Sequence, residues 1–276
     1  MIAHCEDIKP LLRRDPGVRP PLSILLVEDN RAGRKIIAML LKNRGHRVTV
    51  ARTGCQAVRR FASGRFDAVL MDVEMPVMNG YQTAAAIRRK ERQSGVRTPI
   101  IALTAHAPSG ERQNASAAGI DACLGKPLHV DQLLSLIDIM RHEPQNAANA
   151  DGRAPGVARC GNCEGPAVDI PATMRRLDND RELFLNFVEI FNEDAPRLLE
   201  SIRSAAEVGD MTLISRGAHA LKGLAANFHA SAILEIASQL ELATPDDLGE
   251  RRTDLPAKLA EEIARVQAAL SRYAER

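Results

Sequence analysis

The first half of the chain alternates short apolar runs with segments of helical spacing. Five runs are continuously apolar and rich in β-branched residues, as is typical of strands that are covered on both faces of a parallel sheet. The runs are residues 23–29, 47–51, 66–72, 98–105 and 120–127. Helical patterns follow them, first around Ile36, Ile37, Leu40 and Leu41 and then over 54–64, 81–91, 110–119 and 131–140. Five β/α repeats in about 120 residues predict an α/β domain with a five-stranded, doubly wound parallel sheet.

The second half contains no strand pattern and is predicted to be all-α. Helical periodicity covers residues 181–208, 211–228, 231–243 and roughly 256–273. Pro196 lies inside the first of these segments, so we expect it to kink or divide that helix. Asp210 and Ser231 are the expected N-caps of the next two helices. Short loops between amphipathic helices predict an antiparallel four-helix bundle.

These patterns divide the chain into four parts. Residues 1–21 are rich in Pro, Arg and Asp and lack a signal-peptide core, so we expect a flexible leader. The α/β domain covers 22–142, a Gly- and Pro-rich flexible linker covers 143–168, and the helical domain covers 169–276. No apolar run approaches the roughly 18 residues that a membrane helix needs. We therefore expect a cytoplasmic protein without a membrane span.

Charge is unevenly divided between the two halves. Residues 1–142 hold 22 Lys and Arg against 13 Asp and Glu, whereas residues 143–276 hold 15 against 22. The net charges of +9 and −7 indicate either two unrelated solvated surfaces or halves that dock on each other or on oppositely charged partners. The basic half has no cluster of Lys and Arg with interleaved aromatic residues, so nucleic-acid binding is not expected.

The five cysteines are scattered and odd in number, which does not indicate a disulfide framework. Cys160 and Cys163 form a single C-x-x-C pair in the linker. A zinc site needs about four ligands, and no second pair is present in the sequence. An ordinary linker is therefore the preferred interpretation of this pair, with metal binding or redox chemistry as the alternative.

Polar residues end four of the five apolar runs. Glu28 and Asp29 end the first run, Asp72 the third, Thr104 the fourth and Lys126 the fifth. The carboxyl ends of parallel strands meet at one edge of a sheet, where functional groups collect. Neighbouring carboxylates are costly unless a divalent cation neutralises them, and Mg²⁺ is the cation that also bridges to phosphate oxygens. The pattern predicts phosphoryl transfer to Asp72 as nucleophile, with Lys126 and the Thr104 hydroxyl holding the phosphoryl oxygens.

The segments around these residues resemble the receiver domain of two-component response regulators. The segments are "LLVEDN" at 25–30, "VLMDVEMPVMNGY" at 69–81, "PIIALTAHA" at 99–107 and "LGKPL" at 124–128. The resemblance implies a flavodoxin-like fold in which Asp72 accepts phosphate. It also implies that Glu28, Asp29 and Asp72 bind Mg²⁺, with the backbone carbonyl of Glu74 as a further ligand.

One position departs from the receiver pattern. The family usually has an aromatic residue three positions before the lysine, and this residue swings inward on activation. In this chain the position is Cys123. We therefore expect the Thr–aromatic switch to be muted or differently connected, without an effect on phosphorylation itself.

The segment "GAHALKGLAANF" at 217–228 places a histidine on a predicted helix. At about 100° per residue, one stripe forms the buried face of this helix and contains Ile214, Ala218, Leu221, Ala225 and Phe228. His219 points roughly 140° away from the stripe, onto an exposed face beside Lys222 and Gly223. Gly223 costs about 1 kcal/mol relative to alanine in a helix interior, which makes sense if a bulky partner must come close.

This helix resembles the H-x-L-K-G helix of histidine-containing phosphotransfer domains, and residues 170–276 fit their four-helix bundle. The resemblance implies that His219 carries phosphate and that Lys222 and Gly223 support it. His229 stands where the family often has glycine. Whether His229 only ends the helix or reaches the site remains open at this stage.

An acceptor aspartate and a carrier histidine in one chain predict the middle of a His–Asp–His–Asp phosphorelay, as in the C-terminal parts of hybrid sensor kinases. Phosphate is expected to reach Asp72 from a sensor histidine kinase and to be exchanged between His219 and a response-regulator aspartate. The sequence contains no recognisable ATP-binding kinase core. In one alternative, phosphorylation of the receiver controls which partners the bundle docks, without Asp72–His219 transfer. In another, the chain is a scaffold assembled through Cys160 and Cys163.

Overall fold

The computed structural model describes residues 20–104, 111–142, 167–244 and 254–275. The chain forms two compact units, one up to residue 157 and one from residue 158. Almost all of the predicted leader and linker, including Cys160 and Cys163, lies outside the described residues. The predicted boundaries at 22, 142 and 169 stay predictions.

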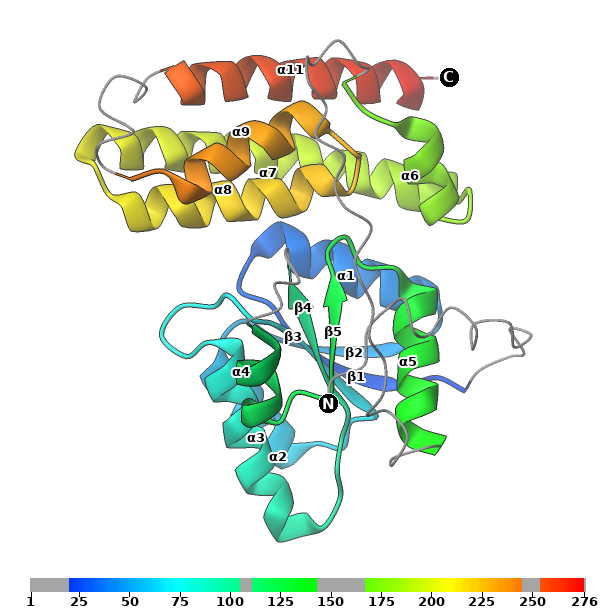
Figure 1. Cartoon of the computed structure of the whole chain (residues 1–276). Coiled ribbons are helices and arrows are strands. Elements are labelled where there is room, and N and C mark those ends of the chain that lie inside the picture. Colours follow the sequence, from blue (N-terminus) through cyan, green and yellow to red (C-terminus); the bar gives the residue numbers. More distant parts are fainter. Residues whose placement is uncertain (1–19, 105–110, 143–166, 245–253, 276) are drawn as a thin grey trace. The chain divides into compact units, whose positions relative to one another are not determined.

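The first unit is a five-stranded parallel sheet with helices on both faces (Figure 1). Its strands are β1 (Ser23–Val27), β2 (Arg47–Ala51), β3 (Ala68–Asp72), β4 (Ile100–Thr104) and β5 (Ala122–Gly125). Its helices are α1 (Arg31–Asn43), α2 (Gly54–Ser63), α3 (Gly80–Ser94), α4 (Glu111–Ala118) and α5 (Val130–His142). The strand order β2-β1-β3-β4-β5 confirms the predicted flavodoxin-like, doubly wound sheet.

The core of this unit explains why its strands read as continuous apolar runs. Every residue of β3 is buried, as are the last four residues of β1. Alternate positions such as Leu25 and Val69 pack with residues of α2, α3 and α4, including Ala57 and Ile87. Helices α1 and α5 lie on the other side of the sheet (Figure 1). Since helices cover both faces, an alternating apolar and polar pattern would place polar residues in a core.

The second unit is helical throughout its described part. Its helices are α6 (Ile170–Arg176), α7 (Arg181–Val208), α8 (Met211–Ala226), α9 (Ser231–Leu242) and α11 (Asp254–Ala274). Helix α7 packs on α8 and α11, and α9 packs on the same two helices, which closes a four-helix bundle (Figure 1). The predicted bundle is therefore confirmed, whereas the short helix α6 was not predicted. None of the described helices combines the length and apolar character needed to cross a membrane.

Pro196 does not divide its helix, because α7 runs unbroken from Arg181 to Val208. Proline in a helix interior costs about 3 kcal/mol. Buried side chains lie on both sides of it, among them Phe191 and Ile202, so the packing of α7 outweighs that cost.

The predicted N-caps have different outcomes. Asp210 caps α8, since its side chain accepts a hydrogen bond from the backbone N–H of Leu213 at 3.0 Å. The prediction for Ser231 is wrong, because Ser231 is already the first residue of α9 and the cap position is held by Ala230 without a side-chain hydrogen bond. Ala230 is fully buried, which indicates that packing decides the residue at this cap.

His229 ends the loop after α8 in the left-handed region, with φ +54°. It lies beyond the end of α8 at Ala226, in a backbone conformation that glycine adopts without steric cost. Burial, together with Arg176, lowers its pKa.

We expect His229→Gly to stabilise the protein by about 0.5–1 kcal/mol, because glycine adopts positive φ without steric cost. Urea unfolding measures this change, and phosphate loading of His219 should stay at the wild-type rate. A loss of loading in a stable His229→Gly variant would show that His229 does take part in the site.

Candidate functional site

Three carboxylates meet where the order of the sheet reverses. Strand β1 pairs with β3 through Val27 and Met71, so the residues that follow them, Glu28 and Asp72, lie at the same edge. Carboxylate oxygens of Glu28, Asp29 and Asp72 lie within 4.8 Å of one another. Glu28 is fully buried and Asp72 is 2% exposed. The carboxyl ends of strands at such a switch point are where doubly wound sheets place their ligand sites.

Lys126, just after β5, bridges two of these carboxylates. Its Nζ donates to Asp72 Oδ2 at 2.6 Å and to Glu28 Oε2 at 3.0 Å. Burial acts to lower the pKa of Lys126, but the charges of Glu28 and Asp72 outweigh it and raise that pKa above its usual range. The ammonium group is therefore a permanent positive charge next to Asp72.

Lys126 alone does not offset the negative charge of the three carboxylates. Burial raises the pKa of Glu28 to about 7, and the neighbouring Asp72 acts in the same direction, while Lys126 opposes both. A second positive charge near Glu28 would favour its ionised form, as Lys126 already does. Three carboxylates at this spacing also supply the oxygen ligands that Mg²⁺ prefers. The residues present thus fit the predicted magnesium ion.

The remaining predicted residues of this site lie beside Asp72. Thr104 ends β4 and accepts a hydrogen bond at its backbone oxygen from the N–H of Lys126 at 2.8 Å. Glu74 has an exposed side chain, and its backbone N–H donates to Asp72 Oδ1 at 3.1 Å. Both therefore lie at the expected edge, and the roles of the Thr104 hydroxyl and the Glu74 carbonyl stay predictions. Cys123 is partly buried against the core, and its effect on activation stays a prediction as well.

Arg34 supports this site and was not predicted from the sequence. Its Nη1 donates to the backbone oxygens of Glu28 and Asp29, both at 2.9 Å, and of Asn30 at 3.2 Å. Asn30 in turn caps α1 by accepting from the N–H of Gly33 at 3.0 Å. These bonds fix the turn that holds two of the three carboxylates. An arginine in the first turn of a helix carries no sequence signal for such a role.

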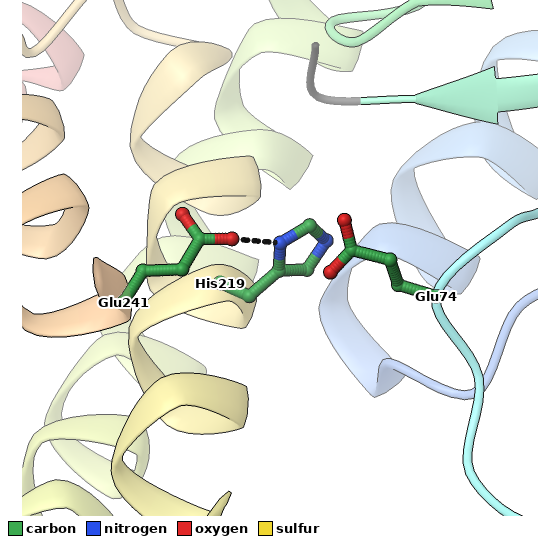
Figure 2. Close-up of side chains that lie close together, drawn as sticks. All are labelled: Glu74, His219 and Glu241. Carbon is green, nitrogen blue, oxygen red and sulfur yellow. Dashed lines mark hydrogen bonds and ion pairs between the residues drawn. The ribbon is translucent and has the colours of Figure 1, made fainter. Parts of the chain in front are cut away.

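His219 lies on α8, off its buried stripe. The stripe predicted from Ile214 to Phe228 is confirmed, since all five of its residues are fully buried. His219 is partly exposed and points toward α9 (Figure 2). Its Nδ1 lies 2.7 Å from Oε1 of Glu241, and Lys222 Nζ donates to Oε2 of the same carboxylate, also at 2.7 Å.

Glu241 is the residue of this site that sequence reasoning missed. Its pKa is lowered to about 2, because the hydrogen bonds from His219 and Lys222 outweigh partial burial, which acts to raise it. The carboxylate is therefore ionised across the physiological range. Glu241 stands on a different helix, 22 positions from His219, so only the packing of α8 on α9 brings the two together.

Gly223 lies in open space among the described residues. A Cβ added there would meet no described atom within 4 Å, whereas one at Gly217 would come within 2.7 Å of Ile202 Cγ1. Packing on α7 thus requires glycine at position 217 but not at 223. This contrast favours the interpretation that Gly223 leaves room for a partner.

We expect Gly223→Ala to stabilise the protein by about 0.5–1 kcal/mol, because alanine has the better helix propensity and meets no obstacle. Gly223→Leu should leave folding intact but slow phosphate exchange between His219 and its partner. Gly217→Ala is the matched control and should destabilise the bundle through its contact with Ile202. Unchanged exchange in Gly223→Leu would contradict a close approach at this position.

Comparison with known proteins identifies two domain families in the chain. The sequence model of the response regulator receiver domain matches residues 24–138, and that of the Hpt domain matches residues 186–274. The chain therefore contains a receiver domain followed by an Hpt domain. This combination supports a function in two-component phosphorelay signalling.

Individual relatives are hybrid or sensor kinases that are much longer than this chain. The sensor protein EvgS of Escherichia coli K12 is 27% identical over 226 residues, which cover 82% of this chain and 17% of EvgS. The sensor protein GacS of Pseudomonas syringae is 39% identical over 132 residues, or 46% of this chain and 14% of GacS. Among solved structures, the receiver domain of the Pseudomonas aeruginosa histidine kinase PA1611, described with a magnesium ion in its active site cleft, is 41% identical. It covers 44% of this chain and 97% of its own, with a TM-score of 0.39.

Proposed function

We propose that this chain is a phosphorelay intermediate that accepts phosphate on Asp72 from a sensor histidine kinase and exchanges it through His219 with a response-regulator aspartate. The observation that carries the proposal is the presence, in one chain, of a lysine-bound carboxylate cluster and a paired histidine. The carboxylate cluster suits formation of an acyl phosphate, and the histidine suits transport of phosphate on a ring nitrogen.

At the receiver, Asp72 is the nucleophile. Its Oδ1 is held by the N–H of Glu74 and its Oδ2 by Lys126, which orients the carboxylate. An Asp72 oxygen forms a bond to phosphorus as the N–P bond of the donor phosphohistidine breaks, and the donor histidine keeps the electron pair. Lys126 and the Thr104 hydroxyl balance the charge on the phosphoryl oxygens. Glu28, Asp29 and Asp72 would hold Mg²⁺, and the bound ion would supply positive charge that offsets these carboxylates and the phosphoryl charge.

At the bundle, a ring nitrogen of His219 attacks the phosphorus of an aspartyl phosphate. The O–P bond breaks, and the aspartate leaves as a carboxylate with the electron pair. Lys222 lies beside the ring, where its positive charge offsets the phosphoryl charge. The open space at Gly223 leaves room for the partner domain.

Incubation of the full chain with Mg²⁺, a purified histidine kinase and radiolabelled ATP tests the proposal. Acyl phosphate is labile to base and phosphohistidine is labile to acid, so the two products are separable. The wild type should carry both labels, His219→Gln only the base-labile one, and Asp72→Asn neither. If His219 never labels while Asp72 does, transfer within the chain is refuted and the receiver acts as a phosphorylation-controlled binding module.

A further inference from the structure

Helices α2 and α3 of the receiver domain carry a cluster of exposed cations. The two helices pack side by side on one face of the sheet (Figure 1). Helix α2 contains no acidic residue, and the one in α3, Glu91, is buried and bound by Arg88. The C-terminal halves of both helices and the loop after α2 present the basic face, which consists of Arg59, Arg60, Arg65, Arg89, Lys90 and Arg92. None of these cations has a carboxylate partner among the described residues.

A neighbouring cation does have such a partner. The side chain of Arg97 is 66% exposed, yet it binds Asp121 at 2.5 Å. The negative end of a helix macrodipole attracts cations only within the last turn, where α2 has Arg60 and α3 has Arg92. The other charges of the basic face lack this support. Because like charges repel, the cluster works against the folded state, which points to a role in binding.

The basic face lies at the edge of the sheet opposite to Asp72. In a parallel α/β fold, each helix begins near the carboxyl ends of the strands and ends near their amino ends. Helix α3 begins beside Asp72, since the N–H of Gly80 donates to the oxygen of Val73 at 3.0 Å. Arg92 lies near the other end of α3, roughly 18 Å along its axis. A partner bound to the basic face therefore leaves the carboxylate cluster accessible.

We propose that the basic face docks a partner protein through a segment of clustered Asp and Glu carboxylates. All but one of its cations are arginines, and a guanidinium binds a carboxylate through two parallel hydrogen bonds. Protein interfaces are enriched in arginine and aromatic residues and depleted in lysine. Phe61 and Phe66 are partly buried beside these arginines, and Val96, just after α3, is 66% exposed, so apolar contact area is present as well. The proposal is independent of phosphate transfer.

Anisotropy of a dye-labelled oligoglutamate peptide, titrated with the full chain at low ionic strength, measures this binding. Arg59→Glu/Arg89→Glu should weaken it about 10-fold, because two exposed ion pairs are replaced by repulsion. The control Arg203→Glu/Lys258→Glu makes the same change of net charge at exposed positions of α7 and α11 and should bind like wild type. Equal weakening in both double variants would show that only net charge attracts the peptide, and the proposal would be wrong.

Amide NMR shifts of the wild-type chain locate the peptide without any substitution, so misfolding of a variant cannot hide the result. The shift changes on addition of peptide should centre on the C-terminal halves of α2 and α3. Changes centred on another surface of the chain would overturn the proposal, whatever affinity the titration gives.

Two further probes distinguish a protein partner from other anionic partners. A single-stranded oligonucleotide and vesicles of phosphatidylglycerol and phosphatidylcholine are titrated under the same conditions as the peptide. The peptide should bind more tightly than either probe at equal anionic charge. Tighter binding of the oligonucleotide would indicate a nucleic-acid partner, and tighter binding of the vesicles would indicate a membrane surface. Either result would overturn the assignment to an acidic protein segment.

Discussion

Asp72→Asn is expected to abolish phosphate uptake from a histidine kinase or a small-molecule phosphodonor, with no base-labile label detectable. The amide is not a nucleophile at neutral pH, so the carboxylate oxygen that Lys126 Nζ contacts in the wild type is lost as phosphate acceptor. The variant should also bind Mg²⁺ more weakly, because one of three clustered carboxylates is lost. Radiolabelling and magnesium titration measure the two effects.

The matched control for this variant is Asp131→Asn, which removes a carboxylate at a 73% exposed position of the same unit. It should label at the wild-type rate. Base-labile label on Asp72→Asn would show that another carboxylate is the acceptor. His219 of the Asp72→Asn chain should still take up phosphate from a separate phosphorylated receiver. This variant therefore separates phosphate acceptance by Asp72 from phosphate transport by His219.

The receiver site could be predicted from the sequence because its residues are placed by the sheet. Parallel strands in a doubly wound order end at one edge, so Glu28, Asp72 and Lys126, each at the end of an apolar run, have to meet there. The pairing of β1 with β3 follows from the same order. The sequence did not predict how charge is distributed at this site. One lysine contacts two carboxylates, and the pKa of Glu28 is nevertheless raised.

The carrier site was only half predictable. His219, Lys222 and Gly223 lie within one turn or so of a single helix, and helical geometry alone relates them. Glu241 comes from α9, and its place opposite His219 depends on how far α9 slides along α8, which the sequence pattern does not fix. Ser231 was assigned wrongly for a related reason, since burial of Ala230 decides where α9 begins.

Lys126→Met is expected to impair both folding and phosphate uptake, since methionine keeps most of the side-chain volume and removes the charge. Breaking a buried ion pair by removing one partner typically costs about 3–5 kcal/mol. Glu28 can relieve part of this cost by binding a proton, because its pKa is already raised to about 7. We therefore expect a loss of about 3 kcal/mol in the free energy of unfolding at pH 8, measured in urea.

The effect of added Mg²⁺ on stability should differ between Lys126→Met and the wild type. A cation at the carboxylates supplies the charge that Lys126→Met lacks, so added Mg²⁺ should stabilise the variant more than it stabilises the wild type. Labelling of Asp72 should still fall about 100-fold, because the ammonium that balances the phosphoryl oxygens is missing. The control Lys90→Met removes an exposed charge from α3 and should change neither quantity. If Lys126→Met unfolds like wild type in the absence of Mg²⁺, the lysine does not compensate the buried carboxylates, and the charge balance derived for this site is wrong.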